Sequence, residues 1–255
     1  MAERGLADSR ERAKALIMSG RVFVGGNRAE KPGMQADADS PVEIRGGLEY
    51  VSRGGFKIEK ALRFFDVSPA GKVCIDCGAS TGGFTDCLLK NGARLVYAVD
   101  VGYGQLAWSI RSNDRVIVME RTNIRYVTTD MFEIKPELAV IDVSFISLSL
   151  VLPVIRDLLE KDGEVLCLIK PQFEAGREKV GKKGVVREPE THQAVLGAFI
   201  QNAKQSGFCI KGLTYSPVKG PVGNVEYLGW LRCEGEDEAA DIVAVVTEAH
   251  KELMQ

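Results

Sequence analysis

The sequence predicts an α/β protein: a Rossmann-like, seven-stranded sheet with helices on both faces, preceded by a small N-terminal α+β unit. From residue 50 onward, short apolar runs alternate with helical patterns, which indicates a parallel sheet. Charged residues also close several of these runs, as expected at the ligand-binding edge of such a sheet. The expected strands span residues 73–76, 95–100, 116–119, 138–142, 165–169, 209–216 and 226–232. No helix separates the last two, so they should form an antiparallel pair that completes the sheet.

Helices are expected between the strands. Phe56, Ala61, Leu62 and Phe65 form an apolar stripe that predicts the first of them. The expected helices span residues 56–65, 83–91, 107–112, 147–161, 191–206 and 239–253.

The N-terminal unit shows a different pattern. Ser9 is the expected N-cap of a short helix that carries an apolar stripe and ends at Gly20. A Gly25-Gly26-Asn27 turn between strands at 21–24 and 42–44 indicates a small β element. About 45 residues bury little core, so the unit should dock on its neighbour. We place the linker at Gly46-Gly47, which divides the chain into residues 1–46 and 47–255.

Composition narrows the class of protein. The chain has 255 residues, of which 45% are hydrophobic and 27% charged, as is typical of a soluble globular protein. No apolar run reaches the roughly 18 residues of a membrane-spanning helix, and the charged N-terminus does not resemble a secretory signal. Cys74, Cys77 and Cys167 lie in apolar strands, which favours buried thiols over redox or zinc chemistry and predicts a reducing, cytoplasmic location.

The net charge of −2 conceals an uneven distribution. The segment from Glu234 to Glu252 contains seven acidic residues and one basic residue, so the rest of the chain is net positive. Residues 10–31 hold six bases and two acids, and residues 170–188 hold six bases and three acids. Each patch could attract phosphate groups or simply form a solvated surface. His192 and His250 have no cysteine or carboxylate at metal-ligand spacing, so we expect no metal site.

A glycine turn follows the first strand of the sheet. The segment Gly78-Ala-Ser-Thr-Gly82-Gly83 matches neither the dinucleotide fingerprint G-x-G-x-x-G nor a P-loop. Asp76 and the backbone of Gly78 can accept hydrogen bonds from an ammonium group, and Asp100 closes the second strand, where acids bind ribose hydroxyls. These features favour S-adenosylmethionine over NAD.

Several motifs resemble those of the TlyA (hemolysin A-like) ribosomal RNA methyltransferases, which belong to the FtsJ-like ribose 2′-O-methyltransferases. They are VSRGGFK, DCGASTGGF, VDVGYGQL, VIDVSFISL, LIKPQFE and KGVVRE, in this order along nearly the whole chain. SRERAKALIMSGRVFVGG resembles the core of an S-four-type RNA-binding domain. The family usually opens with a helix of the pattern Arg-Leu-Asp-x-Leu-Leu, whereas this chain begins Met-Ala-Glu-Arg-Gly-Leu, so we expect an N-terminally truncated RNA-binding unit.

The resemblance implies a reaction and a set of residues. The family's catalytic Lys-Asp-Lys-Glu set corresponds to Lys57, Asp142, Lys170 and Glu226. Lysines are almost fully protonated near pH 7, so Lys170 can act as the base only where its surroundings favour the neutral form. Burial and Lys57 favour that form, whereas Asp142 and Glu226 oppose it. Otherwise the four residues hold the 2′-hydroxyl in line with the methyl group.

Two further sets complete the expected site. The S-adenosylmethionine site should comprise Asp76, Gly78, Ser80, Thr81, Gly82, Gly83, Phe84, Asp100, Asn123 and Asp142. RNA contacts are expected from Arg10, Arg12, Lys14, Arg21, Arg53, Lys182, Lys183 and Arg187. Lys182 and Lys183 lie in a basic, glycine-punctuated loop at 176–187, whose composition suggests mobility. Tyr103 and Phe145 are candidates for stacking on bases, with packing in the core or at the rim as the alternative.

The expected activity is thus 2′-O-methylation of ribosomal RNA, on cytidine riboses if the family's substrates apply, with ribosomal RNA or ribosomal subunits as partners. Three rivals remain open: a membrane-lytic protein, an RNA-binding module with an inactive methyltransferase domain, and an NAD-dependent enzyme. The absence of a long apolar segment argues against the first, and the complete Lys-Asp-Lys-Glu set argues against the second. The NAD-dependent enzyme is distinguished by testing whether NAD or S-adenosylmethionine raises the melting temperature.

Overall fold

The structure is a computed structural model of the 255-residue chain. It describes residues 1–7, 10–18, 20–29, 31–37, 39–44, 49–220 and 222–253, with the side chains of residues 11, 12, 15 and 18 excepted. The expected N-cap Ser9 and the expected linker Gly46-Gly47 lie outside the described residues.

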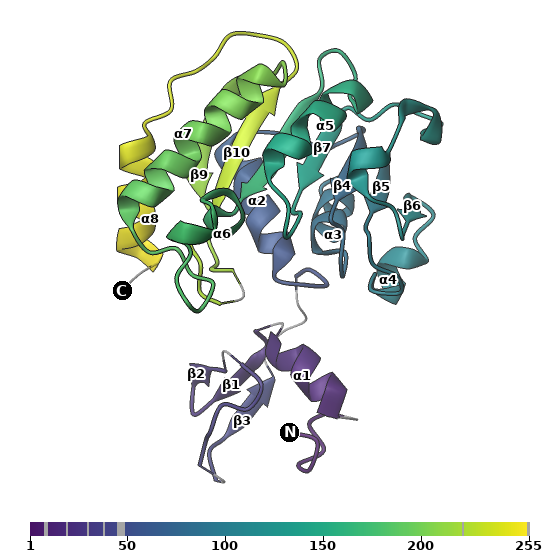
Figure 1. Ribbon diagram of the computed structural model, residues 1–255. Coiled ribbons are helices and arrows are strands. Elements are labelled where there is room, and N and C mark those ends of the chain that lie inside the picture. Colours follow the sequence, from purple (N-terminus) through teal and green to yellow (C-terminus); the bar gives the residue numbers. More distant parts are fainter. Residues whose placement is uncertain are drawn as a thin grey trace.

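The larger part of the chain is built on a seven-stranded sheet of order β6-β5-β4-β7-β8-β10-β9 (Figure 1). Strands β4 to β8 pair in parallel, and β10 runs antiparallel between β8 and β9, so six of these seven strands point in the same direction. The expected antiparallel pair is therefore present, and its second strand lies inside the sheet. The strands are β4 (Val73–Cys77), β5 (Leu95–Val99), β6 (Val116–Met119), β7 (Leu138–Ile141), β8 (Glu164–Ile169), β9 (Cys209–Tyr215) and β10 (Tyr227–Arg232).

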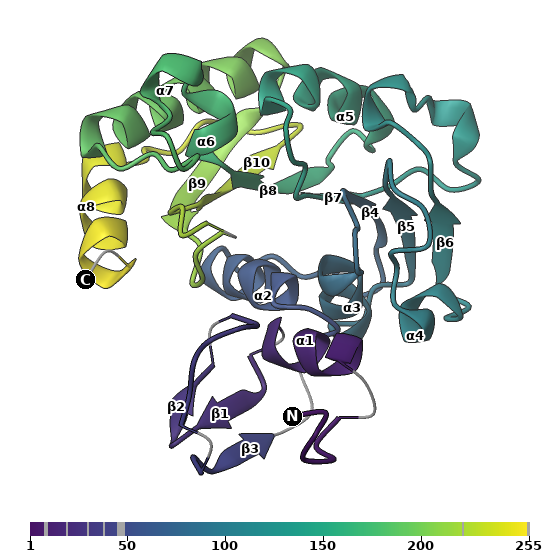
Figure 2. The ribbon, with the colours of Figure 1, turned by 60° about the horizontal axis from the view of Figure 1, so that its bottom comes forward.

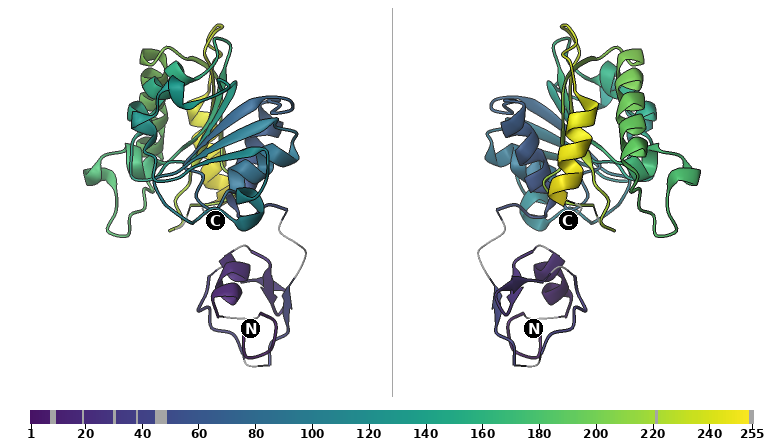
Figure 3. Two further views of the ribbon diagram at one scale, coloured as in Figure 1. Left: turned by 90° about the vertical axis from the view of Figure 1, so that its right-hand side faces the viewer. Right: turned by 90° about the vertical axis from the view of Figure 1, so that its left-hand side faces the viewer.

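Helices cover both faces of the sheet, as Figures 2 and 3 show. Alternation along β4 places Val73, Ile75 and Cys77 on one face, in a core that α5, α7 and α8 complete. Cys74 packs on the other face, in a core shared with α2, α3 and α4. The helices are α2 (Gly54–Phe64), α3 (Gly83–Lys90), α4 (Trp108–Arg111), α5 (Leu152–Leu158), α6 (Pro171–Glu174), α7 (Pro189–Gln205) and α8 (Ile242–Leu253).

The helix expected at 147–161 is shorter than the sequence suggests. A 3₁₀ turn (Leu148–Leu150) precedes α5, which begins only at Leu152 and ends at Leu158. Glu174 accounts for the late start, since its carboxylate accepts hydrogen bonds from the Ser147 hydroxyl (2.6 Å) and the Leu148 amide (2.8 Å). These bonds keep the start of the segment, at Ser147 and Leu148, out of the α-helical conformation. The other 3₁₀ turns are Ile124–Tyr126, Thr129–Met131 and Arg177–Lys179.

The N-terminal unit contains α1 (Arg10–Met18) and a three-stranded antiparallel sheet of order β2-β1-β3. Its strands are β1 (Val22–Val24), β2 (Asn27–Arg28) and β3 (Val42–Ile44). Gly25 and Gly26 both have positive φ (56° and 81°), as a two-residue hairpin turn requires. The buried core consists of Leu16, Val22 and Ala29 among the described residues, which is small, as expected. Figure 1 places the unit beside the end of the sheet from which the loops after β5 and β8 extend.

Candidate active site

Four charged residues meet at one edge of the large sheet because of where its strands end. Asp142 directly follows β7, and Lys170 directly follows the parallel strand β8. Glu226 precedes the antiparallel strand β10, and the register of Tyr227 opposite Ile169 brings Glu226 alongside Lys170. Lys57 reaches this edge from the first turns of α2. Residues separated by up to 169 positions in the chain therefore converge.

The four side chains form two ion pairs. Lys57 Nζ donates to Glu226 Oε2 at 2.6 Å, and Glu226 is completely buried. Lys170 Nζ lies 2.5 Å from Asp142 Oδ1 and also donates to the Val143 carbonyl (2.9 Å) and the Ser144 hydroxyl (3.1 Å). A carboxylate, a carbonyl and a hydroxyl oxygen therefore surround the Lys170 nitrogen.

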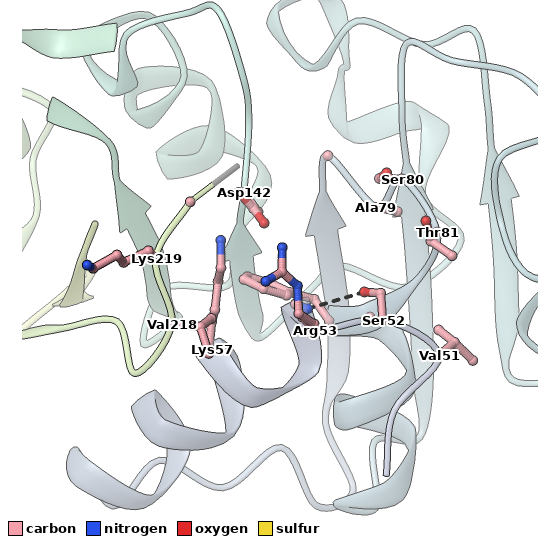
Figure 4. Close-up of a pocket in the computed structure, with 15 residues that line it drawn as sticks. Val51, Ser52, Arg53, Lys57, Ala79, Ser80, Thr81, Asp142, Val218 and Lys219 are labelled. Carbon is pink, nitrogen blue, oxygen red and sulfur yellow. Dashed lines mark hydrogen bonds between the residues drawn. The ribbon is translucent and has the colours of Figure 1, made fainter. Parts of the chain in front are cut away.

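Only one member of each pair faces the open site. Lys57 and Asp142 line a cleft of about 450 Å³, together with Arg53 and Lys219 (Figure 4). Lys170 and Glu226 are not among the residues that line this cleft; they lie behind their partners with at most 7% of their surface exposed.

A second hollow, of about 440 Å³, adjoins the first, and the two share Gly78, Ser80 and Asp142. Asp100 and Asn123, the residues expected at the nucleoside end of the cofactor, both line it. Asp100 is held in place because its two oxygens accept hydrogen bonds from the Ser80 and Gly102 amides, each at 2.7 Å. An oriented carboxylate at this position fits a ribose diol.

The glycine turn forms the wall between the two hollows. Gly78 has φ of +89°, and a Cβ atom there would lie 2.7 Å from the Asp142 carbonyl oxygen, so only glycine fits. Among the other residues expected at the cofactor, Thr81, Gly83 and Phe84 line the first cleft. Gly82 does not line either hollow. It is the N-cap of α3, and its φ of +95° and close approach to Leu106 give it a structural role.

Asp76 also lies behind the wall instead of lining it. Its side chain is fully buried, and its Oδ2 accepts hydrogen bonds from the Thr85 amide (3.0 Å) and hydroxyl (2.6 Å). Its Oδ1 has no hydrogen-bond partner among the described residues. Burial raises the pKa of Asp76 to about 7, although the bonds from Thr85 oppose this. Although Asp76 lines neither hollow, its buried carboxylate would be stabilised through space by a positive charge in the adjoining site, such as the ammonium end of S-adenosylmethionine.

Sequence reasoning missed several lining residues. Lys219 adds a positive charge to the first cleft, and Gln105 and Thr122 line the second. Gln105 and Thr122 follow strands β5 and β6, so their positions after strand ends could have identified them. Lys219 lies in the connection between β9 and β10, seven residues before Glu226, where nothing in the pattern distinguishes it.

The residues expected to bind RNA are dispersed. Arg10 and Lys14 are exposed and Arg21 is partly exposed on the N-terminal unit, while the Arg12 side chain lies outside the described part of the chain. Arg53 lines the first cleft. The three bases of the loop are exposed: Lys182, Lys183 and Arg187.

The two aromatic residues proposed to stack on bases are open to solvent. Tyr103 is 68% exposed and Phe145 is 90% exposed, so neither is packed in the core. Phe145 lines the second hollow, has φ of +64° and lies 5.0 Å from the Phe173 ring.

The cysteines and histidines take no part in this site. Cys74, Cys77 and Cys167 are buried free thiols, as predicted, and burial raises the pKa of Cys74 to about 12. Buried His192 contacts the Tyr227 hydroxyl and the Val186 carbonyl. Within the described ranges, no cluster of three or more potential ligands could hold a metal ion.

Comparison with known proteins gives the family. The model of the FtsJ-like methyltransferases matches residues 50–233, and that of the S4 domain matches residues 1–42. The chain is 53% identical to "Putative rRNA methyltransferase YqxC" of Bacillus subtilis, over the full chain and 94% of that protein. It is 41% identical to "16S/23S rRNA (cytidine-2'-O)-methyltransferase TlyA" of Mycobacterium tuberculosis, over the full chain and 96% of that protein.

A solved structure is also similar. The "Putative hemolysin from Streptococcus thermophilus" superimposes with a TM-score of 0.79 at 47% identity, over 99% of this chain and 94% of that one. Over the described residues, no helix has the length and apolar character needed to cross a membrane. The family matches and the paired hollows at the sheet edge agree: the chain belongs to the TlyA (hemolysin A-like) group of FtsJ-like methyltransferases, carries an S4 domain, and uses S-adenosylmethionine as its methyl donor.

Proposed function

We propose that this enzyme transfers a methyl group to the 2′-oxygen of cytidine riboses in ribosomal RNA. The observation that carries the proposal is that Lys57 and Asp142 both line a cleft adjoining the second hollow. A cationic donor and a carboxylate side by side can hold a hydroxyl group between them. The name of the Mycobacterium tuberculosis relative, at 41% identity, supports ribosomal RNA and cytidine as the targets.

The work left to the protein is alignment and the removal of one proton. S-adenosylmethionine supplies a methyl group on a sulfonium, which already has a good leaving group. Lys57 and Asp142 orient the 2′-hydroxyl by donating and accepting hydrogen bonds, respectively. The Asp142 carboxylate receives the hydroxyl proton as the new bond forms, a contribution of about 10²- to 10⁴-fold for a positioned base.

The two inner residues fix the outer ones. The Lys170 ammonium holds one oxygen of Asp142, and its bonds to Val143 and Ser144 fix the ammonium itself. Glu226 holds Lys57 in the same way from a fully buried position. We therefore assign Lys170 and Glu226 as positioning residues, which corresponds to the alternative in which the four residues hold the 2′-hydroxyl in line without Lys170 acting as the base.

Basic residues on three separate elements would bring the RNA to this cleft. They belong to the N-terminal unit, the cleft wall and the loop after β8, and each could contact phosphate groups. We further propose that the RNA-binding unit ends at residue 46, and that the substrate is ribosomal RNA within a ribosomal subunit. A ribosomal substrate would place the enzyme in the cytoplasm, as the sequence predicts.

The test is methyl transfer from labelled S-adenosylmethionine to unmodified ribosomal subunits and to the corresponding naked RNA. Stops of reverse transcription then map the modified nucleotides. Lys170→Ala serves as the inactive control, because it removes the charge that holds Asp142. Transfer by the wild type to a cytidine, with none by the variant, is the expected result. Label in neither RNA nor subunits, despite binding of the donor, would contradict the proposal and favour an RNA-binding module.

A further inference from the structure

The basic loop at 176–187 has an ordered tip, although its composition suggests mobility. The Gly184 amide donates to the Gly181 carbonyl at 2.8 Å, and the Gly181 amide donates to the Val185 carbonyl at 3.1 Å. These bonds close a tight turn with Lys182 and Lys183 at its centre, both exposed. The turn therefore presents two adjacent positive charges to solvent.

On the C-terminal side of this tip, hydrogen bonds of the Val186 backbone attach the loop to the rest of the protein. Val186 is 1% exposed, although its neighbour Arg187 is open to solvent. The Val186 amide donates to Asn224 Oδ1 at 3.0 Å, and Asn224 Nδ2 donates to the Gly184 carbonyl at 2.8 Å. One buried asparagine thus binds the loop with both ends of its amide.

A histidine holds the other side of the same peptide. His192 Nε2 lies 3.1 Å from the Val186 carbonyl, which can only accept, so Nε2 carries the proton. His192 Nδ1 must then accept the hydroxyl proton of Tyr227, at 2.7 Å. His192 and Tyr227 are both fully buried.

These anchors lie next to the ion pair of the active site. Asn224 lies two residues before Glu226, the residue that holds Lys57, and Tyr227 directly follows it; all three are buried. The Asn224 carbonyl also accepts the Gly220 amide (2.9 Å), adjacent to the cleft residue Lys219. The lysines at the loop tip and the Lys57–Glu226 pair are consequently attached to the same short stretch of chain.

We infer that Asn224, His192 and Tyr227 are positioning residues that fix the basic loop to the segment bearing Glu226, so that an RNA held by Lys182 and Lys183 is set in register with the cleft. This inference rests on the proposed function and deepens it. It assigns a substrate-positioning role to residues that touch neither RNA nor methyl donor. A purely structural role would make their loss affect stability alone.

The discriminating experiment is a double-mutant cycle measured on the Kd for ribosomal RNA. Asn224→Ala is combined with the double substitution Lys182→Ala/Lys183→Ala. Freeing the loop from Asn224 should weaken RNA binding about tenfold or more. Because a misplaced loop no longer uses its lysines, removing their charges should cost much less in the Asn224→Ala background. The Kd for S-adenosylmethionine should stay within about twofold of wild type.

Controls separate the possible failures. Asn91→Ala removes a comparable bond, from Asn91 Nδ2 to the Cys87 carbonyl (2.8 Å) at the far end of α3, and should leave RNA binding unchanged. If Asn224→Ala does not fold, the cycle is run with Tyr227→Phe, which deprives His192 of one partner. Strict additivity, or RNA binding unaffected by either substitution, would overturn the inference. Because the readout is binding, it stands even if the wild type transfers no methyl group, a result that would instead refute the proposed function.

Discussion

Breaking the Lys57–Glu226 pair should destabilise the fold and abolish activity by two separable effects. In Lys57→Met, the Glu226 carboxylate remains fully buried, and it loses the partner of Oε2 while Oε1 already has none among the described residues. An uncompensated buried charge of this kind costs about 3–5 kcal/mol. Since domains of this size are stable by roughly 5–15 kcal/mol, the variant should still fold in the absence of denaturant.

The second substitution separates stability from catalysis. Lys57→Met/Glu226→Leu also removes the unpaired Glu226 carboxylate. Two apolar side chains of similar size then replace the ion pair, so the free energy of unfolding should recover most of what Lys57→Met lost. Methyl transfer should not return, because no cationic group then faces the 2′-hydroxyl. We expect kcat/KM to fall at least about 100-fold in both variants.

A matched pair at the opposite edge of the sheet provides the control. Lys72 Nζ lies 2.5 Å from Glu164 Oε2, at the starts of β4 and β8, and both side chains are partly exposed. Lys72→Met should therefore cost only about 1 kcal/mol and leave activity near that of the wild type. Urea unfolding and steady-state kinetics measure the two quantities. Recovered activity in the double variant would refute the reasoning, since it would make the Lys57–Glu226 pair merely structural.

Three further predictions concern the cofactor wall and the loop. Because burial raises the pKa of Asp76 to about 7, well above its value in the unfolded chain, its contribution to stability is fully present below about pH 4 and is lost as the pH rises to about 7. Urea titrations of the apoprotein should show Asp76→Asn to be the less pH-dependent protein across that window, and parallel curves would contradict the assignment. Gly78→Ala should weaken S-adenosylmethionine binding about tenfold or more, because the added Cβ at positive φ displaces the Asp142 backbone. Calorimetry measures the affinity, and an unchanged Kd would show that the backbone adjusts to the extra atom without disturbing the site. Lys182→Glu/Lys183→Glu should weaken RNA binding and reduce the slope of log Kd against log salt concentration by roughly two, and an unaltered slope would exclude phosphate contacts by the loop tip.

Much of the site was predictable because strand ends can be read from local sequence. Asp142 and Lys170 interrupt apolar runs, and the structure places both directly after buried parallel strands. The glycine turn after β4 and Asp100 after β5 were identified by the same reasoning. In each case the change from apolar to polar residues at the end of a strand identifies the position of the site residue.

What could not be predicted depends on contacts between distant segments. The pairing of Lys57 with Glu226 spans 169 residues and arises from the insertion of β10 between β8 and β9. The withdrawal of Asp76 behind the cofactor wall follows from its bonds to Thr85 at the start of α3, which strand alternation alone does not indicate. The anchoring of Val186 by Asn224 likewise joins two loops that have no shared pattern in sequence.

The position of the transferred methyl group tests the central claim most directly. Ribosomal RNA methylated by the purified enzyme would be digested completely to nucleosides and analysed by mass spectrometry, with fragmentation that separates ribose from base. Our account predicts the added mass on the ribose of cytidine, and its loss when Asp142→Asn replaces the wild type. A methyl group on the base would contradict it, because Lys57 and Asp142 would then not be holding a 2′-hydroxyl.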